Sequence, residues 1–368
     1  MSDDELIAVL RLQKIPNIGY VIAKKLISHC GSPTAVFQDK MQQLLKIDGV
    51  GMYTLQCLHD PQYLKDAEKE FRFIKQKDIN ISYFMDANYP SYFKHCIDSP
   101  LLLFNRGNIN LENRKIISVV GTRKITSYGT AFCEKLIEDL APLDPIIVSG
   151  LAYGVDICVQ RAAVKQGLQT IGCLAHGLNQ IYPKAHAKYM LEIEENGGFF
   201  TEFWSTSKPE RENFLKRNRV IAGISEATIV IESAEKGGSL VTADIAHSYN
   251  RDVFAVPGRA QDKYSIGCNN LIKQQKAHML TSAADLVYML GWELEAERGK
   301  GIQQQMFIEL DTTEKEIYNY LLKEGKQLLD TIALSCNLPI FTVSSTLLNM
   351  EMKGVIRPLP GKLFEALS

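Results

Sequence analysis

The feature that most constrains this chain is a regular alternation of short apolar runs and amphipathic segments, which begins at Lys115. The apolar runs are continuous, as expected for strands that are covered on both faces. Strands that alternate with helices of this size form a parallel α/β sheet. We predict strands at Ile116–Val120, Ile146–Ser149, Thr170–Leu174, Gly198–Phe203, Thr228–Glu232, Val253–Val256 and His278–Thr281. We predict helices at Tyr128–Leu140, Gly154–Gln166, Ala185–Asn196, Phe214–Gly223, Ser239–Asn250 and Ala283–Leu290.

The segments on either side of this pattern predict two further domains, which the length of the chain allows. Residues 1–75 are predicted to be all helical. Residues 76–293 are predicted to form the sheet domain, in which residues 76–114 supply a linker-like segment and a short buried strand, Leu101–Phe104. Residues 294–309 are predicted to be a linker and residues 310–368 a small C-terminal domain.

The N-terminal segment contains a twofold repeat of the pattern apolar-x-x-apolar-Gly followed by an amphipathic helix. The copies are Ile15–Gly19, before Tyr20–His29, and Ile47–Gly51, before Met52–His59. The repeat resembles the helix-hairpin-helix element, in which a tight Gly turn presents backbone N–H groups to a phosphate. Asn17 stands where the first Gly of the first copy is expected. The alternative is a small helical bundle whose hairpins only pack, which the weakly basic flanks favour.

The C-terminal segment has the order of a winged-helix domain. Helices are predicted at Thr313–Lys323, capped by Thr312 or Thr313, and at Gln327–Cys336 and Phe341–Lys353, before two strands around a Pro-Gly turn. Acidic residues outnumber cations by one here, and Lys353 is the only cation of the third helix. We therefore expect this domain to contact protein rather than DNA.

Composition excludes several classes of function. The formal net charge of −1 means that a nucleic-acid site has to be a local basic patch. No apolar run is long enough for a membrane span, and the acidic N-terminus is unlike a signal peptide, so we expect a cytoplasmic protein. The eight Cys and seven His form no C-x-x-C or H-E-x-x-H pattern, so neither a metal site nor a disulfide framework is predicted. No G-x-G-x-x-G or Walker loop is present, so no nucleotide cofactor is predicted.

The loops that follow the predicted strands carry most of the chemically informative residues. In an open α/β sheet, ligands bind beyond the carboxyl ends of the strands. The Gly237-Gly238-Ser239 loop precedes a helix and supplies the close backbone approach and N–H donors that hold a phosphate. The cations expected on the same rim are Arg123, Lys184, Lys216, Arg217 and Arg219. Together these loops predict a site for a phosphate-rich ligand.

The stretch Phe214–Gly223 is predicted to begin a helix, so that its cations lie in the first turn. Cations are mildly disfavoured there by the helix dipole, which suggests a negatively charged ligand. A solvated helix end with incidental charge is the alternative. Arg217 and Arg219 are two residues apart and point to different sides of a helix. One of them is expected to face phosphate, and the other could anchor a loop carboxylate such as Asp156.

At the level of motifs, the chain resembles the DprA/Smf DNA-processing family from about Tyr89 to Leu290. The resemblance implies an extended Rossmann-like domain that dimerises, binds single-stranded DNA and loads a RecA-type recombinase onto it during natural transformation. The motifs are Gly121-Thr122-Arg123, Ser149-Gly150-Leu151-Ala152-x-Gly154-x-Asp156, Ile181-Tyr182-Pro183, Arg217-Asn218-Arg219-x-Ile221-Ala222-Gly223, Gly238-Ser239-Leu240-x-Thr242-Ala243, Val256-Pro257-Gly258 and Gly267-x-Asn269-x-Leu271-Ile272.

The resemblance also implies roles for individual residues. Phosphates are expected at Arg123, at Lys184 and at the backbone of Gly237–Ser239, and Phe214 is a candidate surface for base stacking. The full set of expected DNA-binding residues is Gly121, Thr122, Arg123, Lys184, Arg211, Phe214, Lys216, Arg217, Asn218, Arg219, Gly237, Gly238 and Ser239. The chain departs from the family at Leu215, where Pro is usual, and at Lys276-Ala277, where Gly-Ala is usual near the expected dimer surface.

The competing hypothesis is an enzyme that cleaves nucleotide N-glycosidic bonds on a similar sheet. It would use Glu202 and Glu232 as an acid/base pair, and it needs a carboxylate beside the phosphate loop. We expect His176 and His186 to be structural rather than catalytic, and no catalytic residue is predicted.

Overall fold

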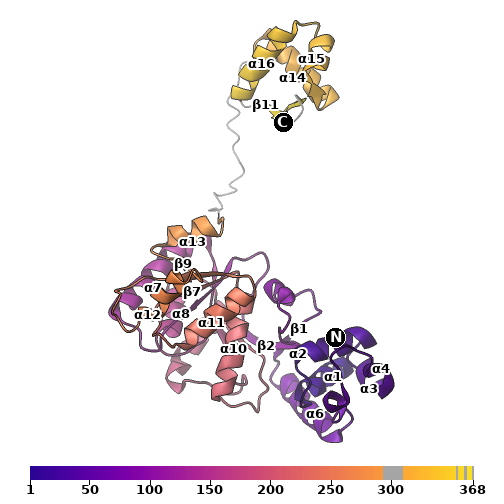
Figure 1. Cartoon of the computed structure of the whole chain (residues 1–368), viewed down its shortest axis with the longest axis vertical. Helices are drawn as coiled ribbons and strands as arrows, with labels where there is room; N and C mark the ends of the chain where they lie inside the picture. The colour runs from indigo at the N-terminus through magenta and orange to yellow at the C-terminus, as the bar shows by residue number, and fades with distance from the viewer. Residues whose placement is uncertain (293–309, 354, 360–362, 367–368) are drawn as a thin grey trace. The chain divides into compact units, whose positions relative to one another are not determined.

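The computed structural model describes residues 1–292, 310–353, 355–359 and 363–366 (Figure 1). The chain divides into two compact units, Met1–Leu294 and Glu295–Ser368, which are described separately. The predicted linker at 294–309 and the turn of the C-terminal hairpin lie outside the described residues. The boundary predicted at residue 75 falls inside the first unit.

The first unit is built on one nine-stranded sheet in the order β1-β2-β6-β5-β4-β3-β7-β8-β9. From β6 to β9 neighbouring strands are parallel, which confirms the predicted parallel-rich α/β fold. At the other end, β2 pairs antiparallel with both β6 and β1. The strands are β1 (Asn80–Tyr83), β2 (Leu102–Gly107), β3 (Ile116–Val120), β4 (Ile146–Ser149), β5 (Thr170–Cys173), β6 (Gly197–Thr201), β7 (Ala227–Val230), β8 (Asp252–Ala255) and β9 (His278–Met279).

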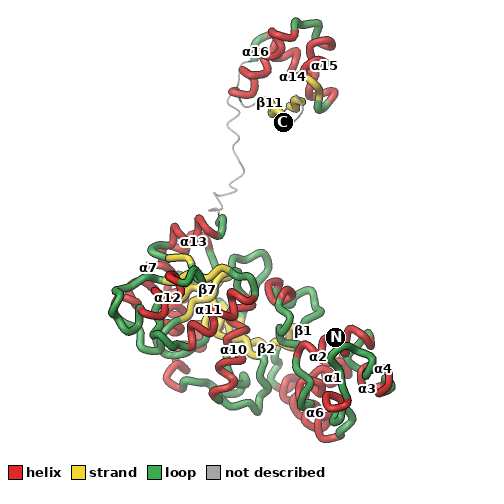
Figure 2. The backbone as a smooth tube through the Cα atoms, viewed as in Figure 1, coloured by secondary structure: helices red, strands yellow, loops and turns green. Residues whose placement is uncertain are grey.

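Helices cover both faces of this sheet, which lies between them in Figure 2. On one face α7, α8 and α13 pack against Ile117 and Val119 of β3, and on the other α10, α11 and α12 pack against Ile116 and Val120. The helices are α7 (Ser127–Leu140), α8 (Val155–Lys165), α9 (Met190–Glu195), α10 (Arg211–Ile224), α11 (Gly238–Ser248), α12 (Ile266–Lys273) and α13 (Ala283–Met289). Alternate residues of one strand thus serve two cores, which explains the continuous apolar runs.

Four elements of the sheet domain differ from the predictions. Helix α10 begins at Arg211 rather than Phe214, so Lys216, Arg217 and Arg219 lie beyond its first turn. The helix predicted at Ala185–Asn196 is a 3-10 turn, Lys184–Tyr189, followed by α9. Helix α12 was not predicted. Strand β2 continues past Phe104 to Gly107 because it pairs with β6, a partner about 90 residues later in the chain.

The N-terminal helices share a hydrophobic core with the sheet domain. Their buried residues contact Leu151, Leu174, Phe199 and Trp204 of that domain. The helices are α1 (Asp3–Lys14), α2 (Tyr20–Cys30), α3 (Ala35–Gln38), α4 (Met41–Leu44), α5 (Met52–Leu55) and α6 (Pro61–Gln76). This shared core explains why the two segments form one compact unit.

The two hairpins of the N-terminal repeat have the same backbone geometry. Asn17 (φ +66°) and Gly49 (φ +80°) occupy equivalent left-handed positions, and Gly19 and Gly51 are the N-caps of α2 and α5. Asn tolerates the left-handed region better than most residues, so the missing Gly does not alter the turn.

The second unit contains three helices and a three-stranded sheet in the order β10-β12-β11, which confirms the winged-helix prediction. Asp311 caps the first helix in a capping box with Glu314, so the cap predicted at Thr312 or Thr313 was wrong. The Asp311 carboxylate accepts a hydrogen bond from the backbone N–H of Glu314, and the Glu314 carboxylate accepts one from the backbone N–H of Asp311. The elements are α14 (Thr312–Glu324), β10 (Gln327–Leu328), α15 (Leu329–Ser335), α16 (Ile340–Met352), β11 (Ile356–Leu359) and β12 (Leu363–Ala366).

Helix α16 presents little positive charge. Its neighbour Lys353 donates to both carboxylate oxygens of the buried Glu314, at 2.7 and 2.6 Å. Phe341 and Leu348 of the same helix are exposed. These features favour the predicted protein contact over insertion of α16 into a DNA groove.

In the described part of the chain no single helix is long and apolar enough to cross a membrane, although the bent pair α15 and α16 would pass together by length and composition.

Candidate nucleic-acid interface

The sheet has its topological switch point between β3 and β7. Strand β3 pairs with β4 on one side and with β7 on the other, so the chain winds outward in both directions from this point. A hollow of about 930 Å³ lies there, lined by the loops after β3 and β7 and by α10 and α11. This is the position at which doubly wound sheets bind ligands.

The floor of the hollow depends on a close crossing of two loops. Val155 N–H donates to the carbonyl of Thr122 at 3.1 Å, so the loop after β4 lies directly against the loop after β3. Gly154, with φ +78°, sits at this crossing, and a Cβ there would lie 2.2 Å from the Thr122 carbonyl oxygen. Only glycine fits this position, because it has neither the side chain nor the backbone restriction.

The N-terminus of α11 opens into the hollow. Its N-cap, Gly237, makes no side-chain cap, and Gly237, Gly238 and Ser239 all line the hollow. A Cβ at Gly238 would meet only open space. The helix is anchored from behind by Asn218, whose side-chain amide donates to the Gly238 carbonyl at 3.4 Å. Uncapped N–H groups at the positive end of a helix dipole suit a phosphate.

Phe214 lies at the centre of an aromatic and cationic group on the wall formed by α10. The guanidinium groups of Arg123 and Arg217 lie over its ring, 5.3 and 5.8 Å from the centroid. The ring of Tyr182 meets it edge-on at 5.8 Å. Tyr182 is 41% exposed. The group therefore combines positive charge with aromatic surface, which single-stranded nucleic acid can use for phosphate contact and base stacking.

Three exposed cations on the wall of the hollow make no ion pair with the described part of the chain. They are Arg123, Arg211 and Lys236. The acidic residues that line the hollow are Asp156 and Asp244, and Asp244 pairs with Lys276 at 3.0 Å. The hollow therefore presents positive charge that the protein itself does not neutralise.

Arg217 lines the hollow but is only 5% exposed. Its Nη1 donates to the carbonyls of Gly150 (2.7 Å) and Cys173 (2.5 Å). Burial lowers its pKa, while nearby Asp156 opposes that effect. Asp156 accepts from the N–H groups of Gly150 (3.1 Å) and Ala152 (3.3 Å), and burial raises its pKa against the influence of Arg217. Arg217 therefore organises the loop after β4 and places one buried charge behind Phe214.

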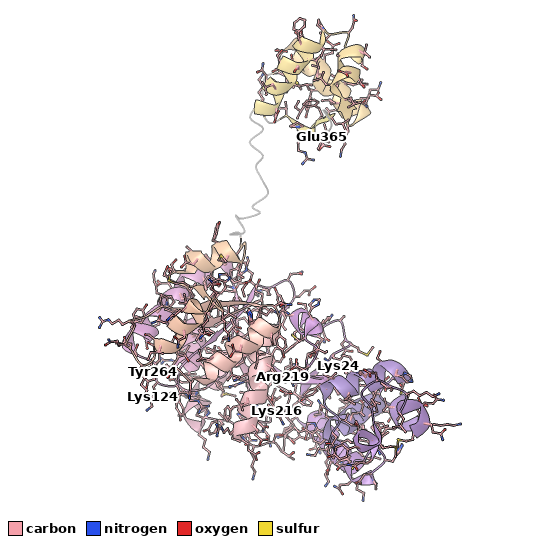
Figure 3. The ribbon with its side chains drawn as sticks, in the orientation of Figure 1. Lys24, Lys124, Lys216, Arg219, Tyr264 and Glu365 are labelled. Carbon is pink, nitrogen blue, oxygen red and sulfur yellow. The ribbon has the colours of Figure 1, made fainter. Side chains whose placement is uncertain are left out.

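Arg219 does not line the hollow, which differs from the expectation that all these cations share one rim. It is 8% exposed, pairs with Glu202, donates to the Asp98 carbonyl, and lies over the ring of Tyr20 at 4.4 Å from its centroid. Figure 3 shows Lys24 of α2 near Arg219 and Lys216 further along α10. Burial lowers the pKa of Arg219, but Glu202 and Tyr20 outweigh it and the pKa is raised overall.

Two other expected residues also lie off the hollow. Lys236, which lines the hollow, and Tyr182, which contacts the lining residue Phe214, had no assigned role. Lys184 is exposed at the start of the 3-10 turn and does not line the hollow, whereas Lys216 lines a different one. Tyr182 and Lys236 were overlooked as site residues. Both lie in recognisable patterns, Ile-Tyr-Pro and Lys-Gly-Gly-Ser. The signals that could have found them are an aromatic residue before a loop proline and a cation before a loop glycine.

The carboxylates required by the hydrolase hypothesis do not line this hollow. Glu232 accepts from the N–H and hydroxyl of Thr126, at 2.9 and 2.5 Å, and so anchors the start of α7. Glu202 is engaged by Arg219 and Tyr20. His176 and His186 are buried and contact backbone carbonyls of Gly177 and Leu151. No group of His, Cys, Asp and Glu among the described residues is arranged to hold a metal ion.

Comparisons with known proteins find relatives of both units of the chain. The family described as DNA recombination-mediator protein A matches residues 80–291, and the DprA winged helix domain matches residues 308–362. DNA processing protein DprA of Streptococcus pneumoniae is 36% identical over 224 residues, which cover 61% of this chain and 78% of that protein.

Two solved structures are also similar. The X-ray structure of DNA processing protein A from Streptococcus pneumoniae has a TM-score of 0.65 at 29% identity and covers 78% of this chain and 98% of its own. The structure of DNA processing protein A from Helicobacter pylori, described for its single-stranded DNA binding mode, has a TM-score of 0.52 at 29% identity and covers 58% and 95%.

Proposed function

Because the chain belongs to the DNA recombination-mediator protein A family, we propose that it binds single-stranded DNA in the hollow at the β3–β7 switch point. The observation that carries this proposal is that one hollow is lined by the aromatic ring of Phe214, by exposed cations without an ion pair in the described structure, and by an uncapped helix N-terminus. The Helicobacter pylori relative, described for binding single-stranded DNA, supports the same ligand.

The proposed binding mode assigns phosphates and bases to different parts of the hollow. Phosphates meet Arg123, Arg211, Lys236 and the backbone of Gly237–Ser239, beside the loop residues Gly121 and Thr122. A base stacks against Phe214 or Tyr182. A base can stack on an aromatic side chain only when it is not stacked inside a DNA duplex. This arrangement therefore favours single-stranded over double-stranded DNA.

We further propose that the bound strand is passed to a RecA-type recombinase during natural transformation. The family's description as a recombination mediator supports this role, and so does the exposed apolar surface of α16, which suits a protein partner. The reaction would need no catalytic residue of this chain, only the DNA site and a protein contact. A cytoplasmic location remains the prediction that fits this role.

The sheet domain also offers a surface for the predicted homodimer. Strand β9 is a two-residue edge strand, and Met279, Tyr288 and Met289 near it are exposed. An edge strand with apolar neighbours is a natural site for pairing with a second copy. Lys276 stands where Gly is usual in the family. Its charge is paired with Asp244 of the same chain, so it does not prevent this surface from packing against a second copy. Analytical ultracentrifugation of the wild type and of Met279→Asp tests this, and the substitution should shift the dimer toward monomer.

The experiment that tests DNA binding is a titration of fluorescent oligo-dT with the purified chain at two salt concentrations. We expect affinity to fall steeply with salt, because binding releases counterions from the phosphates. A duplex of the same length serves as the control and should bind more weakly. Absence of oligo-dT binding at low salt would contradict the proposal. Release of free base from a nucleoside monophosphate, lost in Glu232→Gln, would instead support the hydrolase.

A further inference from the structure

A second hollow lies on the opposite side of α10, against the first hairpin of the N-terminal helices. Its volume is about 480 Å³, within the range of roughly 300–1,000 Å³ that is typical of ligand pockets. The hairpin contributes Ile18 and Gly19, and α10 contributes Asn213 and Lys216. Another part of the wall comes from the segment after β6, which includes Glu202, Phe203 and Trp204.

The positive side of this hollow is formed by a helix end and two lysines. Helix α2 starts at Tyr20 behind the N-cap Gly19, which makes no side-chain cap. Its first N–H groups therefore resemble those of α11 in the first hollow. Lys14 and Lys216 line the same hollow, are exposed, and make no ion pair with the described residues. Lys14 lies over the Trp204 ring, 5.2 Å from its centroid.

An unpaired buried acceptor lies on the wall of the same hollow. The side chain of Glu202 is 1% exposed, and its Oε2 accepts from Tyr20 and Arg219. Its Oε1 is buried and has no hydrogen-bond partner among the described residues. A buried carboxylate oxygen without a donor is costly, so a ligand that donates a hydrogen bond would be stabilised there.

We propose that this hollow is a second nucleotide subsite on the path of the single-stranded DNA. A phosphate binds between Lys14, Lys216 and the N-terminus of α2, and the base turns its amino group toward Oε1 of Glu202. The inference rests on the proposed DNA binding and extends it to the N-terminal hairpin. The Glu202 carboxylate alone would repel the negatively charged strand. The two lysines and the N–H groups of α2 supply the positive charge that offsets this repulsion.

Helix α10 makes the two subsites continuous. Asn213 and Lys216 are three residues apart on one face and line the second hollow, whereas Phe214 and Leu215 line the first. A strand that crosses the N-terminal half of α10 therefore meets both hollows within adjacent residues of one helix.

The unpaired carboxylate oxygen also predicts a base preference. Cytosine and adenine present an exocyclic amino group that donates to a carboxylate. Thymine has no amino group, and its ring N–H lies between two carbonyl oxygens that a carboxylate repels. We therefore expect the full chain to bind oligo-dC or oligo-dA more tightly than oligo-dT.

The first test uses fluorescence anisotropy with oligo-dC of about 15 nucleotides, near the upper end of known single-strand site sizes. Lys14→Ala and Lys216→Ala should each weaken binding by about 3- to 10-fold. Each should also reduce the slope of the logarithm of affinity against the logarithm of salt concentration by about one, as expected for the loss of one phosphate contact. Lys25→Ala is the matched control, because Lys25 is on α2 but pairs with Asp48 and lines neither hollow. If Lys14→Ala and Lys216→Ala bind like the wild type while Arg123→Ala binds poorly, the second subsite is refuted and the proposed function stands. If the wild type does not bind, the proposed function itself fails.

The second test compares oligo-dC with oligo-dT. Glu202→Gln should bring the ratio of the two affinities close to one, whereas the buried Glu232→Gln, which lines neither hollow, should keep the wild-type ratio. An unchanged ratio in folded Glu202→Gln would overturn the base contact. If Glu202→Gln does not fold, a smaller dC preference in Lys14→Ala supports the subsite and an unchanged preference overturns it.

Discussion

The arginines on the two sides of α10 differ in burial and in charge pairing. On the side of Phe214, Arg123 and Arg211 are exposed and have no carboxylate partner in the described structure. On the side of Arg219, the guanidinium is buried and paired with Glu202. Arg217 and Arg219 come from one short motif, yet Arg217 lines the first hollow and Arg219 holds the N-terminal helices against the sheet. Burial and the presence of a carboxylate, rather than residue type, separate a ligand-binding cation from an architectural one.

Arg217 stands between these two groups. It lines the first hollow like a ligand-binding residue, but it is buried and donates to two backbone carbonyls like a structural one. It therefore contributes charge to the hollow while holding the loop after β4 in place.

The largest effect is expected for Arg219→Met. It leaves Glu202 as an unpaired buried charge, which should lower the free energy of unfolding by about 3–5 kcal/mol. Urea unfolding followed by tryptophan fluorescence measures this for the first unit, because Trp204 and Trp292 both lie in it. Changing Glu202 to Met as well should recover part of the loss. A stable Arg219→Met variant that loses DNA binding would instead make Arg219 a ligand contact.

Arg123→Ala should have its effect on binding rather than on stability. Loss of a charge-assisted contact to phosphate should weaken oligonucleotide binding by about 1–3 kcal/mol. Lys124→Ala is the neighbouring control, since Lys124 is exposed and does not line the hollow. Mobility-shift titration of both variants provides the measurement. Equal affinities for Arg123→Ala, Arg217→Ala and the wild type would remove the first hollow from the DNA path.

Phe214→Ala should weaken binding by about 1 kcal/mol, at the low end of the range for stacking of a base on an aromatic ring. The low value is expected because Arg123 and Arg217 already lie over the ring. Phe214→Leu keeps apolar bulk without an aromatic face. If the leucine variant binds as well as the wild type, the ring acts through its bulk and not through stacking.

The smallest effect is a pH dependence at Lys24. Burial, assisted by the nearby positive charge of Arg219, lowers the pKa of Lys24 from 10.5 to about 8. The folded state therefore binds this proton more weakly than the unfolded state, so the stability cost of Lys24 is present below pH 8 and is relieved as pH rises toward 10.5. Unfolding of Lys24→Met beside the wild type isolates this change from other groups. The stability difference between them should move in favour of the wild type above pH 8, and a difference that is independent of pH would contradict the prediction.

Most of the fold was predictable because its signals are local. The apolar periodicity from Ile116 to His278 located every parallel strand to within a few residues. The continuation of β2 to Gly107 was not predictable in this way, because it depends on pairing with β6. Helix α12 is eight residues long and packs through Cys268, Leu271 and Ile272, so its apolar pattern is too short to recognise.

The candidate site was predictable in part. Loop residues such as Arg123 and Gly237–Ser239 were located because the carboxyl ends of parallel strands meet at one edge. Lys184 and Arg219 were placed on the same rim by their position in the sequence, and the structure places them elsewhere. Tyr182 was overlooked as a site residue because its neighbour in the hollow, Phe214, is 32 residues away.

The sequence by itself determined the doubly covered parallel sheet, the paired hairpins and the set of loops at the binding edge, because each follows from periodicity or from residues adjacent in the chain. Only the tertiary structure decided which cations line the first hollow without a carboxylate partner among the described residues. Arg219 pairs with Glu202, lies over Tyr20 and donates to the Asp98 carbonyl, and these residues come from three separate segments. Arg123 has no carboxylate partner in the described structure. Charge pairing depends on distance in space and on exclusion of water, and neither quantity can be read from the order of residues alone.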